Sequence, residues 1–305
     1  MKKDLVSIAD LDREEIEELF KIAVRLKKEE DNSLYKKTLA LVFEKPSLRT
    51  RVTFSVAMFQ LGGNVVYLAR EDIKIGERES IKDVARNLSR WVDVVAARTY
   101  KHETIEELAK YAKIPVINAL SDKEHPCQTL GDFLTIKEKF GKTQVKLAYI
   151  GDGNNVCHSL LLSAALLDTE IWVASPKGYE PEEFYVNKAI EFAKSGKAKI
   201  VITNDPKEAV RDAEVIYTDV WASMGQEHER EKRKKVFSPY QVNKELLKYA
   251  SPNYTVMHCL PAHRGEEITD EVLDDEVHSV VLDQAENRLH IEKAILLKLI
   301  KRKNG

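Results

Sequence analysis

The sequence has 305 residues, of which 48 are basic and 50 acidic, so its formal net charge is −2. This balance creates no global field that would attract nucleic acid or a membrane surface, and no run approaches the roughly 18 apolar residues of a membrane span. The segment 1–5 lacks the apolar core of a signal peptide, so we expect a cytoplasmic protein without nucleic-acid or membrane partners. The length suits two α/β domains better than one.

The first half of the chain alternates helical and strand-like runs. Ile16, Leu19, Phe20 and Ala23 recur at helical spacing and predict a helix over 12–28. Short β-rich runs then predict strands at 38–43, 64–68, 94–98 and 115–118, with helices between them.

The second half repeats this alternation. Strands are predicted at 146–150, 170–174, 199–203, 215–218, 255–258 and 280–282. A helix over 129–140 separates the two sets, and a last helix covers 288–301. The polar segment 221–239 is predicted to be a mobile, solvated loop, placed where a lid would be.

The pattern predicts an α/β protein with two similar-sized domains, each a parallel sheet flanked by helices. Linking and C-terminal helices would cross between the domains. The expected boundaries are 1–133 for the first domain, 134–142 for the linking helix, 143–285 for the second domain, and 286–305 for a C-terminal helix that packs back on the first.

The stretch from Glu44 to Arg51 is suited to binding a dense anion. It follows a predicted strand and opens a helical run, so Pro46 is expected in the first turn and Ser47 as the cap. The first N–H groups of such a helix bind anions, and an arginine such as Arg49 matches phosphate oxygens with its planar fork. Taken alone, the stretch is equally well explained as a surface turn with solvated arginines.

Polar residues also follow the other predicted strands. In parallel α/β sheets, ligands bind beyond the carboxyl ends of the strands. In the first half, these ends carry arginines, a histidine and a glutamine, which suit a phosphate joined to a polarised carbonyl. In the second half they carry Asn155, Asp219 and the Cys259 thiol, which suit a cationic amine. Two complementary half-sites would imply transfer between two small molecules.

Other chemistries have weaker support. Gly151 and Gly153 after a strand evoke a dinucleotide-binding turn, but Val156 occupies the third glycine position. His258, Cys259 and His263 do not complete a tetrahedral metal set, so no metal site is predicted. Cys259 can also be a small buried hydrophobe, and His125 a simple helix cap.

Four ordered motifs give the chain a resemblance to the aspartate/ornithine transcarbamylase family, and to its ornithine branch in particular. The segment 47–51 (SLRTR) resembles the carbamoyl-phosphate signature, and 125–128 (HPCQ) the His-Pro-x-Gln element. The segment 219–225 (DVWASMG) is similar to the ornithine-binding segment, and 258–261 matches H-C-L-P. The resemblance implies carbamoyl transfer from carbamoyl phosphate to the δ-amine of L-ornithine, giving L-citrulline and phosphate, in a homotrimer or an assembly of trimers.

The resemblance also implies site residues. Those expected to bind carbamoyl phosphate are Ser47, Leu48, Arg49, Thr50, Arg98, His125, Gln128, Cys259, Leu260 and Arg288. Those expected to bind ornithine are Asn155, Asp219, Ser223 and Met224. Arg98, His125, Asp219 and Cys259 would be catalytic. No cofactor is required, because carbamoyl phosphate is already activated.

Two positions depart from the family pattern. Leu48 stands where many relatives carry threonine, which removes a hydroxyl but leaves the backbone donor. Lys74 stands where relatives often supply Gln or His to the site of a neighbouring subunit. It would reach phosphate across an interface or point to solvent, and the sequence favours neither.

The chemistry suits these residue types independently of the family. Neutralising an alkyl ammonium at pH 7 costs roughly 4 kcal/mol, so some group must favour the neutral amine. Cys259 and Asp219 are candidates for orienting the amine, and the acceptor of its proton is left open. Arg98 and His125 would stabilise the charge that grows on the carbamoyl oxygen.

The acceptor is the main open alternative. Putrescine, lysine, N-acetylornithine and aspartate are the rivals; the segment 223–225 favours an amino-acid amine, and 258–261 disfavours aspartate. An NAD-binding oxidoreductase and a non-catalytic interaction protein are more remote. The sequence does not decide between the biosynthetic and degradative directions.

Overall fold

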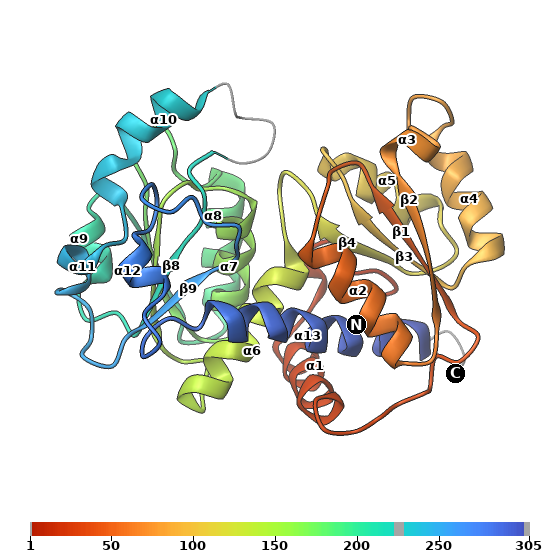
Figure 1. Cartoon of the computed structure of the whole chain (residues 1–305), viewed down its shortest axis with the longest axis horizontal. Coiled ribbons are helices and arrows are strands. Elements are labelled where there is room, and N and C mark those ends of the chain that lie inside the picture. The colour runs from red at the N-terminus through yellow and green to blue at the C-terminus, as the bar shows by residue number, and fades with distance from the viewer. Residues whose placement is uncertain (1, 223–228, 302–305) are drawn as a thin grey trace. The chain divides into compact units, whose positions relative to one another are not determined.

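The computed structural model describes residues 2–222 and 229–301, and the chain divides into two compact units. Unit 1 comprises Met1–Leu134 and Glu286–Gly305, and unit 2 comprises Thr135–Ala285. Each unit contains a parallel sheet flanked by helices (Figure 1), which confirms the predicted fold class. Among the described residues, no helix is both long and apolar enough to span a membrane.

The sheet of unit 1 has four strands in the order β2-β1-β3-β4, and every pair is parallel. The strands are β1 (Thr38–Phe43), β2 (Asn64–Ala69), β3 (Val94–Arg98) and β4 (Val116–Leu120). They match the predicted strands closely, because β1 and β3 are short apolar runs buried along nearly their whole length, as expected for a parallel sheet.

Helices connect these strands. They are α1 (Arg13–Leu26), α2 (Arg49–Gln60), α3 (Arg70–Ile73), α4 (Ile81–Trp91), α5 (His102–Tyr111) and α6 (Pro126–Phe140). The predicted opening helix is confirmed as α1. Asp12 and Glu15 form a capping box at its start, and Ile16, Leu19 and Phe20 are buried on one face.

Unit 2 has a five-stranded parallel sheet in the order β7-β6-β5-β8-β9. Its strands are β5 (Lys146–Ile150), β6 (Glu170–Ala174), β7 (Lys199–Thr203), β8 (Val215–Thr218) and β9 (Thr255–His258), all at the predicted positions. Its helices are α7 (Asn155–Leu166), α8 (Glu183–Ala193), α9 (Pro206–Val210), α10 (Arg230–Phe237), α11 (Lys244–Leu247) and α12 (Asp270–Leu273).

The predicted strand at 280–282 is wrong, because helix α13 (Val281–Lys301) begins there rather than at Arg288. Ser279 makes one isolated bridge to Val256 of β9, and the helix starts two residues later. Leu282 is 75% exposed, which a buried strand residue would not be. A run as short as Val-Val-Leu fits either structure by periodicity alone.

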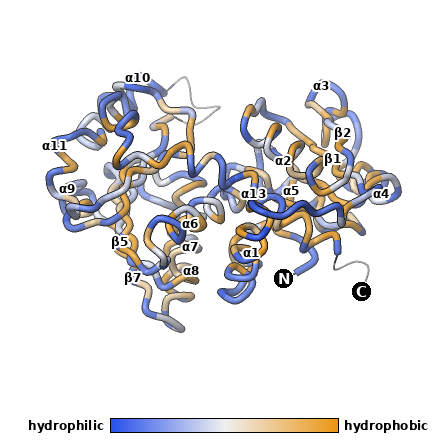
Figure 2. The backbone as a smooth tube through the Cα atoms, turned by 60° about the horizontal axis from the view of Figure 1, so that its bottom comes forward, coloured by the Kyte–Doolittle hydropathy of each residue, from blue (hydrophilic) through white to orange (hydrophobic). Residues whose placement is uncertain are grey.

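The predicted loop over 221–239 is also wrong in part, since residues 230–237 form α10, while 223–228 lie outside the described residues. Figure 2 shows α10 as hydrophilic, which explains the interpretation as a loop. Its helical periodicity rests on two residues, Arg233 and Phe237, which lie four apart and are both buried. One ion-paired arginine and one aromatic ring therefore give this helix its inner face.

Two helices contain the unit boundaries. The division between units falls after Leu134 within α6 and after Ala285 within α13. The linking helix begins at Pro126, three residues before its predicted start, so Cys127 and Gln128 belong to its first turn.

Candidate active site

The strand order of each sheet reverses at one point, and several of the candidate residues lie beyond those points, whereas His125 and Cys259 follow the edge strands β4 and β9. In unit 1 the reversal lies between β1 and β3; in unit 2 it lies between β5 and β8. Crevices at such switch points are the usual ligand sites of parallel α/β sheets. The residues after β1 and β3, and those after β5 and β8, therefore occupy the expected positions.

The segment after β1 folds differently from the prediction. Helix α2 starts at Arg49; its N-cap is Leu48, with φ −76° and ψ −65° and no side-chain cap bond. The expectation that Ser47 caps the helix and Pro46 lies in its first turn is thus wrong. The first intrahelical bond joins the Val52 N–H to the Leu48 carbonyl. Leu48 is 74% exposed, and Ser47 and Arg49 are partly exposed.

Arg98 and His125 approach the same region of unit 1 from β3 and from the turn after β4. The pairing of β3 with β4 shifts register between Ala97 and Arg98, and such irregularities re-aim a side chain at the end of a strand. Both side chains are almost fully buried. Burial, together with the positive charges of Arg288, Arg98 and Arg49, holds the pKa of His125 well below its usual value. His125 is therefore neutral at physiological pH.

Arg288 joins two further predicted residues. Its Nη1 donates to Gln128 Oε1 at 2.6 Å, and its Nη2 donates to Thr50 Oγ1 at 3.3 Å. These residues come from α13, α6 and α2, and each is no more than 2% exposed. Unit 1 thus gathers Thr50, Arg98, His125, Gln128 and Arg288, with Arg49 near enough to affect His125.

In unit 2, the turn after β5 is built around Gly153. A Cβ at this position would meet the Pro181 nitrogen at 2.1 Å, so only glycine fits. The turn places Asn154 as the N-cap of α7, where its Oδ1 accepts from the N–H groups of Val156 and Cys157. The side chain of Asn154 also contacts Asp219, at the end of β8.

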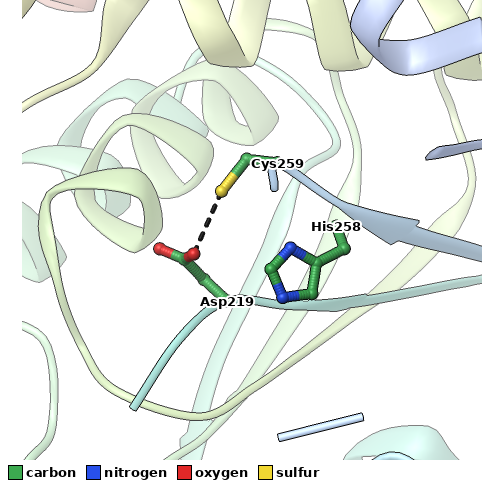
Figure 3. Close-up of side chains that lie close together, drawn as sticks. All are labelled: Asp219, His258 and Cys259. Carbon is green, nitrogen blue, oxygen red and sulfur yellow. Dashed lines mark hydrogen bonds between the residues drawn. The ribbon is translucent and has the colours of Figure 1, made fainter. Parts of the chain in front are cut away.

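Asp219 is held by several donors. Its Oδ2 accepts a hydrogen bond from Asn154 Nδ2 at 2.8 Å. Its Oδ1 accepts one from the backbone N–H of Val220 at 2.8 Å and one from Cys259 Sγ at 3.0 Å. Figure 3 shows the Cys259 thiol pointing at this carboxylate, with the His258 ring beside the pair. Two predicted catalytic residues of unit 2 are therefore in direct contact.

His258 fixes the turn that carries Cys259 and Leu260. Its Nδ1 accepts from the Leu260 N–H at 2.9 Å, so its Nε2 carries the proton and donates to Glu267 Oε1 at 3.0 Å. His258 and Glu267 are both fully buried. Leu260 has φ +56° and is followed by a cis peptide bond to Pro261. Potential ligand atoms of Asp219, His258 and Cys259 lie within 4.8 Å of one another, but hydrogen bonds occupy both ring nitrogens of His258.

The remaining predicted residues of unit 2, and Lys74 of unit 1, are placed as follows. Asn155 is the first residue of α7 and is partly exposed. Lys74 ends α3 in a left-handed conformation, with φ +41°, and is exposed. Ser223 and Met224 lie outside the described residues.

The sequence interpretation missed three polar residues that support the site. Asn154 could have been found, because Asn is a favoured N-cap and it follows a glycine turn. Glu292 lies one helical turn after Arg288, a spacing at which opposite charges pair. Glu267 had no comparable signal, since its contact with His258 depends on tertiary structure.

Known proteins that resemble this chain match it over nearly its whole length. The family model described as aspartate/ornithine carbamoyltransferase, carbamoyl-P binding domain, matches residues 3–138, and the Asp/Orn binding domain matches 143–299. A curated ornithine carbamoyltransferase of Anoxybacillus flavithermus is 54% identical, covering 98% of this chain and 96% of the relative.

Two solved structures are similar as well. The ornithine carbamoyltransferase of Pyrococcus furiosus is 52% identical, with a TM-score of 0.93, covering 96% of this chain and 95% of that one. The anabolic ornithine carbamoyltransferase of Campylobacter jejuni is 41% identical, with a TM-score of 0.95. The match covers 99% of this chain and 100% of that one.

Proposed function

The chain belongs to the aspartate/ornithine carbamoyltransferase family, and on that premise we propose how its residues carry out the reaction of the ornithine branch. The enzyme transfers the carbamoyl group of carbamoyl phosphate to the δ-amine of L-ornithine and releases L-citrulline and phosphate. Its residues divide the substrates between them, with carbamoyl phosphate on unit 1 and the amino acid on unit 2.

The observation that carries this proposal is the opposite chemistry of the residue clusters in the two units. Unit 1 gathers the cationic groups of Arg98 and Arg288 around a neutral histidine, His125. Unit 2 presents the Asp219 carboxylate in contact with the Cys259 thiol. Guanidinium groups match phosphate and carbonyl oxygens, whereas a carboxylate matches an ammonium group.

The phosphate is proposed to bind at the start of α2. The first N–H groups of a helix point along its axis, out of its N-terminal end, without an intrahelical acceptor, and the helix dipole adds positive potential there. Ser47, Leu48, Arg49 and Thr50 supply this end of α2. Arg98 completes the cradle, which is already positively charged when the phosphate leaves.

The carbamoyl carbonyl is polarised by Arg98, His125 and Thr50. As the amine adds to the carbon, negative charge grows on this oxygen, and preorganised donors in a buried site stabilise it without rearranging. His125 donates to the oxygen as a neutral imidazole. The amide end of the carbamoyl group is assigned to Gln128 and Arg288.

On unit 2, the α-amino and carboxylate groups of ornithine are assigned to Asn155, Asp219, Ser223 and Met224. The δ-amine must lose a proton before it attacks, and Asp219 and Cys259 orient it. Asp219 can do this because Asn154 and Val220 fix its carboxylate.

We also infer a homotrimeric assembly in the cytoplasm. Unit 1 exposes large apolar side chains on and beside α2 and β2: Tyr35, Leu48, Val52, Phe59 and Val66. Exposed apolar side chains on neighbouring elements are typical of protein interfaces. The three cysteines are all free thiols, which fits a reducing compartment.

A colorimetric assay of carbamoylated product tests the reaction. The purified protein is given carbamoyl phosphate with ornithine, putrescine, lysine, N-acetylornithine or aspartate in separate reactions. We expect ornithine to give the highest kcat/KM. Faster turnover of any other amine would overturn the assignment.

A further inference from the structure

Glu292 is buried against Arg288 and is not assigned to either substrate. It lies four residues after Arg288 on α13 and has no exposed surface. Its Oε1 accepts two hydrogen bonds from the guanidinium, from Nη2 at 2.7 Å and from Nε at 3.2 Å. The remaining nitrogen, Nη1, is thereby turned toward Gln128.

The far side of this cluster is fixed as well. Gln128 Nε2 donates to Asp132 Oδ1 at 2.8 Å, which leaves its Oε1 to accept from Arg288. Gly131 lies between these two residues on α6, and a Cβ there would come within 3.4 Å of Arg288 Cδ. Glycine thus lets the Arg288 stem lie against α6, between Glu292 and Gln128.

The Glu292 carboxylate does more than neutralise a buried arginine, because it accepts two directional hydrogen bonds from the guanidinium. Burial raises the pKa of Glu292 to about 7, although the charge of Arg288 opposes the shift. A buried ion pair can often be replaced as a whole by apolar residues without loss of stability, whereas removing one partner leaves the other charge buried and unpaired. The directional contacts to Arg288 are what an apolar side chain of similar size would not reproduce.

We propose that Glu292 is a positioning residue for carbamoyl phosphate. It holds the Arg288 guanidinium in the orientation in which the guanidinium also donates to Gln128 and Thr50. This inference rests on the proposed function, in which Arg288 binds the carbamoyl end of the substrate. Glu292 itself does not contact the substrate; it acts through Arg288.

The negative charge of Glu292 and its role in orienting Arg288 have opposite expected effects on carbamoyl-phosphate binding, so variants can separate the two. Removing the carboxylate leaves Arg288 less neutralised, and this alone would tighten the binding of an anion. Removing the hydrogen-bond acceptor frees the guanidinium to rotate and would weaken binding. Glu292→Gln removes the charge but keeps an acceptor oxygen, whereas Glu292→Met removes both at similar volume.

The experiment compares the parent with both variants and with Glu286→Gln. Glu286 is on the same helix, its side chain is 63% exposed, and it pairs with His290 rather than Arg288. The KM of each substrate and kcat are measured after thermal unfolding has shown each variant to be folded. If Glu292→Met does not fold, Glu292→Ala takes its place.

We expect Glu292→Met to raise the KM for carbamoyl phosphate about tenfold, the effect of losing roughly 1.4 kcal/mol of binding. The KM for ornithine should stay within twofold. Glu292→Gln should restore the KM for carbamoyl phosphate to within threefold of the parent, and Glu286→Gln should match the parent.

An unchanged or lower KM for carbamoyl phosphate in folded Glu292→Met would overturn the proposal. Equal loss in the Gln and Met variants would overturn it too, because the acceptor would then not matter. Calorimetric titration with carbamoyl phosphate alone gives the same comparison without ornithine. The positioning role can therefore be judged even if the parent proves to use a different amine.

Discussion

Asn154 and Asp219 are joined by a hydrogen bond of 2.8 Å from the amide of one to the carboxylate of the other, while the carbonyl oxygen of the same amide caps helix α7. One side chain thus fixes the start of a helix and the orientation of a predicted catalytic carboxylate. Because the two tasks use different atoms of Asn154, a substitution can separate them.

Asn154→Ser should preserve the cap and release Asp219. Serine is a good N-cap residue, but its short side chain lacks the amide donor. Loss of a hydrogen bond to a charged group costs about 1.5–3 kcal/mol, so we expect kcat/KM for ornithine to fall by at least tenfold. The melting temperature should change little. Asn243→Ser, at the N-cap of α11, is the matched control and should leave the kinetics unchanged.

His125 should make the folded protein less stable in acid. Its pKa is depressed by burial and by neighbouring arginines, so below the unfolded value of about 6.5 the unfolded state binds more protons. The free energy of unfolding should therefore fall as pH drops from 7.5 to 5, by up to about 1.4 kcal/mol per pH unit from this group.

Denaturant unfolding of the parent and of His125→Gln at several pH values measures this contribution. The glutamine variant should show a shallower loss of stability in acid. Identical slopes for the two proteins would mean that His125 has an ordinary pKa.

Arg49→Lys should weaken the binding of carbamoyl phosphate. Lysine keeps the positive charge at the start of α2 but cannot make two parallel hydrogen bonds to phosphate oxygens. We expect the KM for carbamoyl phosphate to rise about tenfold, with a smaller change in the KM for ornithine. If Arg49→Lys has the kinetics of the parent, Arg49 does not bind the phosphate and the segment is better explained as a solvated surface turn.

Lys74→Ala tests whether a neighbouring subunit completes the site. Lys74 is exposed, and the hydrogen bonds described for it are made by its backbone. If it reaches the phosphate of a neighbouring subunit, the KM for carbamoyl phosphate should rise several-fold. Analytical ultracentrifugation should show the same oligomer for both proteins. An unchanged KM in the intact oligomer would mean that Lys74 points to solvent and does not bind the phosphate.

The ion pair between Arg233 and Asp152 should anchor α10. Arg233 Nη1 lies 3.1 Å from Asp152 Oδ2, and both side chains are at most 10% exposed. Arg233→Leu leaves a buried carboxylate unpaired and should cost about 3 kcal/mol at pH 8.

The cost should be smaller at pH 5, because burial already raises the pKa of Asp152 to about 6 and the unpaired acid will take up a proton there. Arg233→Leu combined with Asp152→Asn should recover most of the stability at pH 8. A single variant as stable as the parent at pH 8 would contradict this anchor.

The local sequence was enough to predict most strands. Strands such as β1, β3 and β5 are short apolar runs between turn residues, and a buried parallel strand leaves that pattern. The local sequence was insufficient where the residues that pack against a segment decide its structure. Val281 starts a helix although its neighbours suit a strand, and α10 is a mostly polar helix whose buried residues are Arg233 and Phe237.

The sequence by itself also determined which residue types follow the strands, and hence the complementary chemistry of the two proposed half-sites. Only the tertiary structure decided which of these side chains touch. The contacts of Asp219 with Asn154 and of His258 with Glu267 depend on turn geometry. That of Arg288 with Gln128 joins residues 160 positions apart. Hydrogen bonds need positions accurate to a few tenths of an ångström, and the packing of sheets and helices sets those positions.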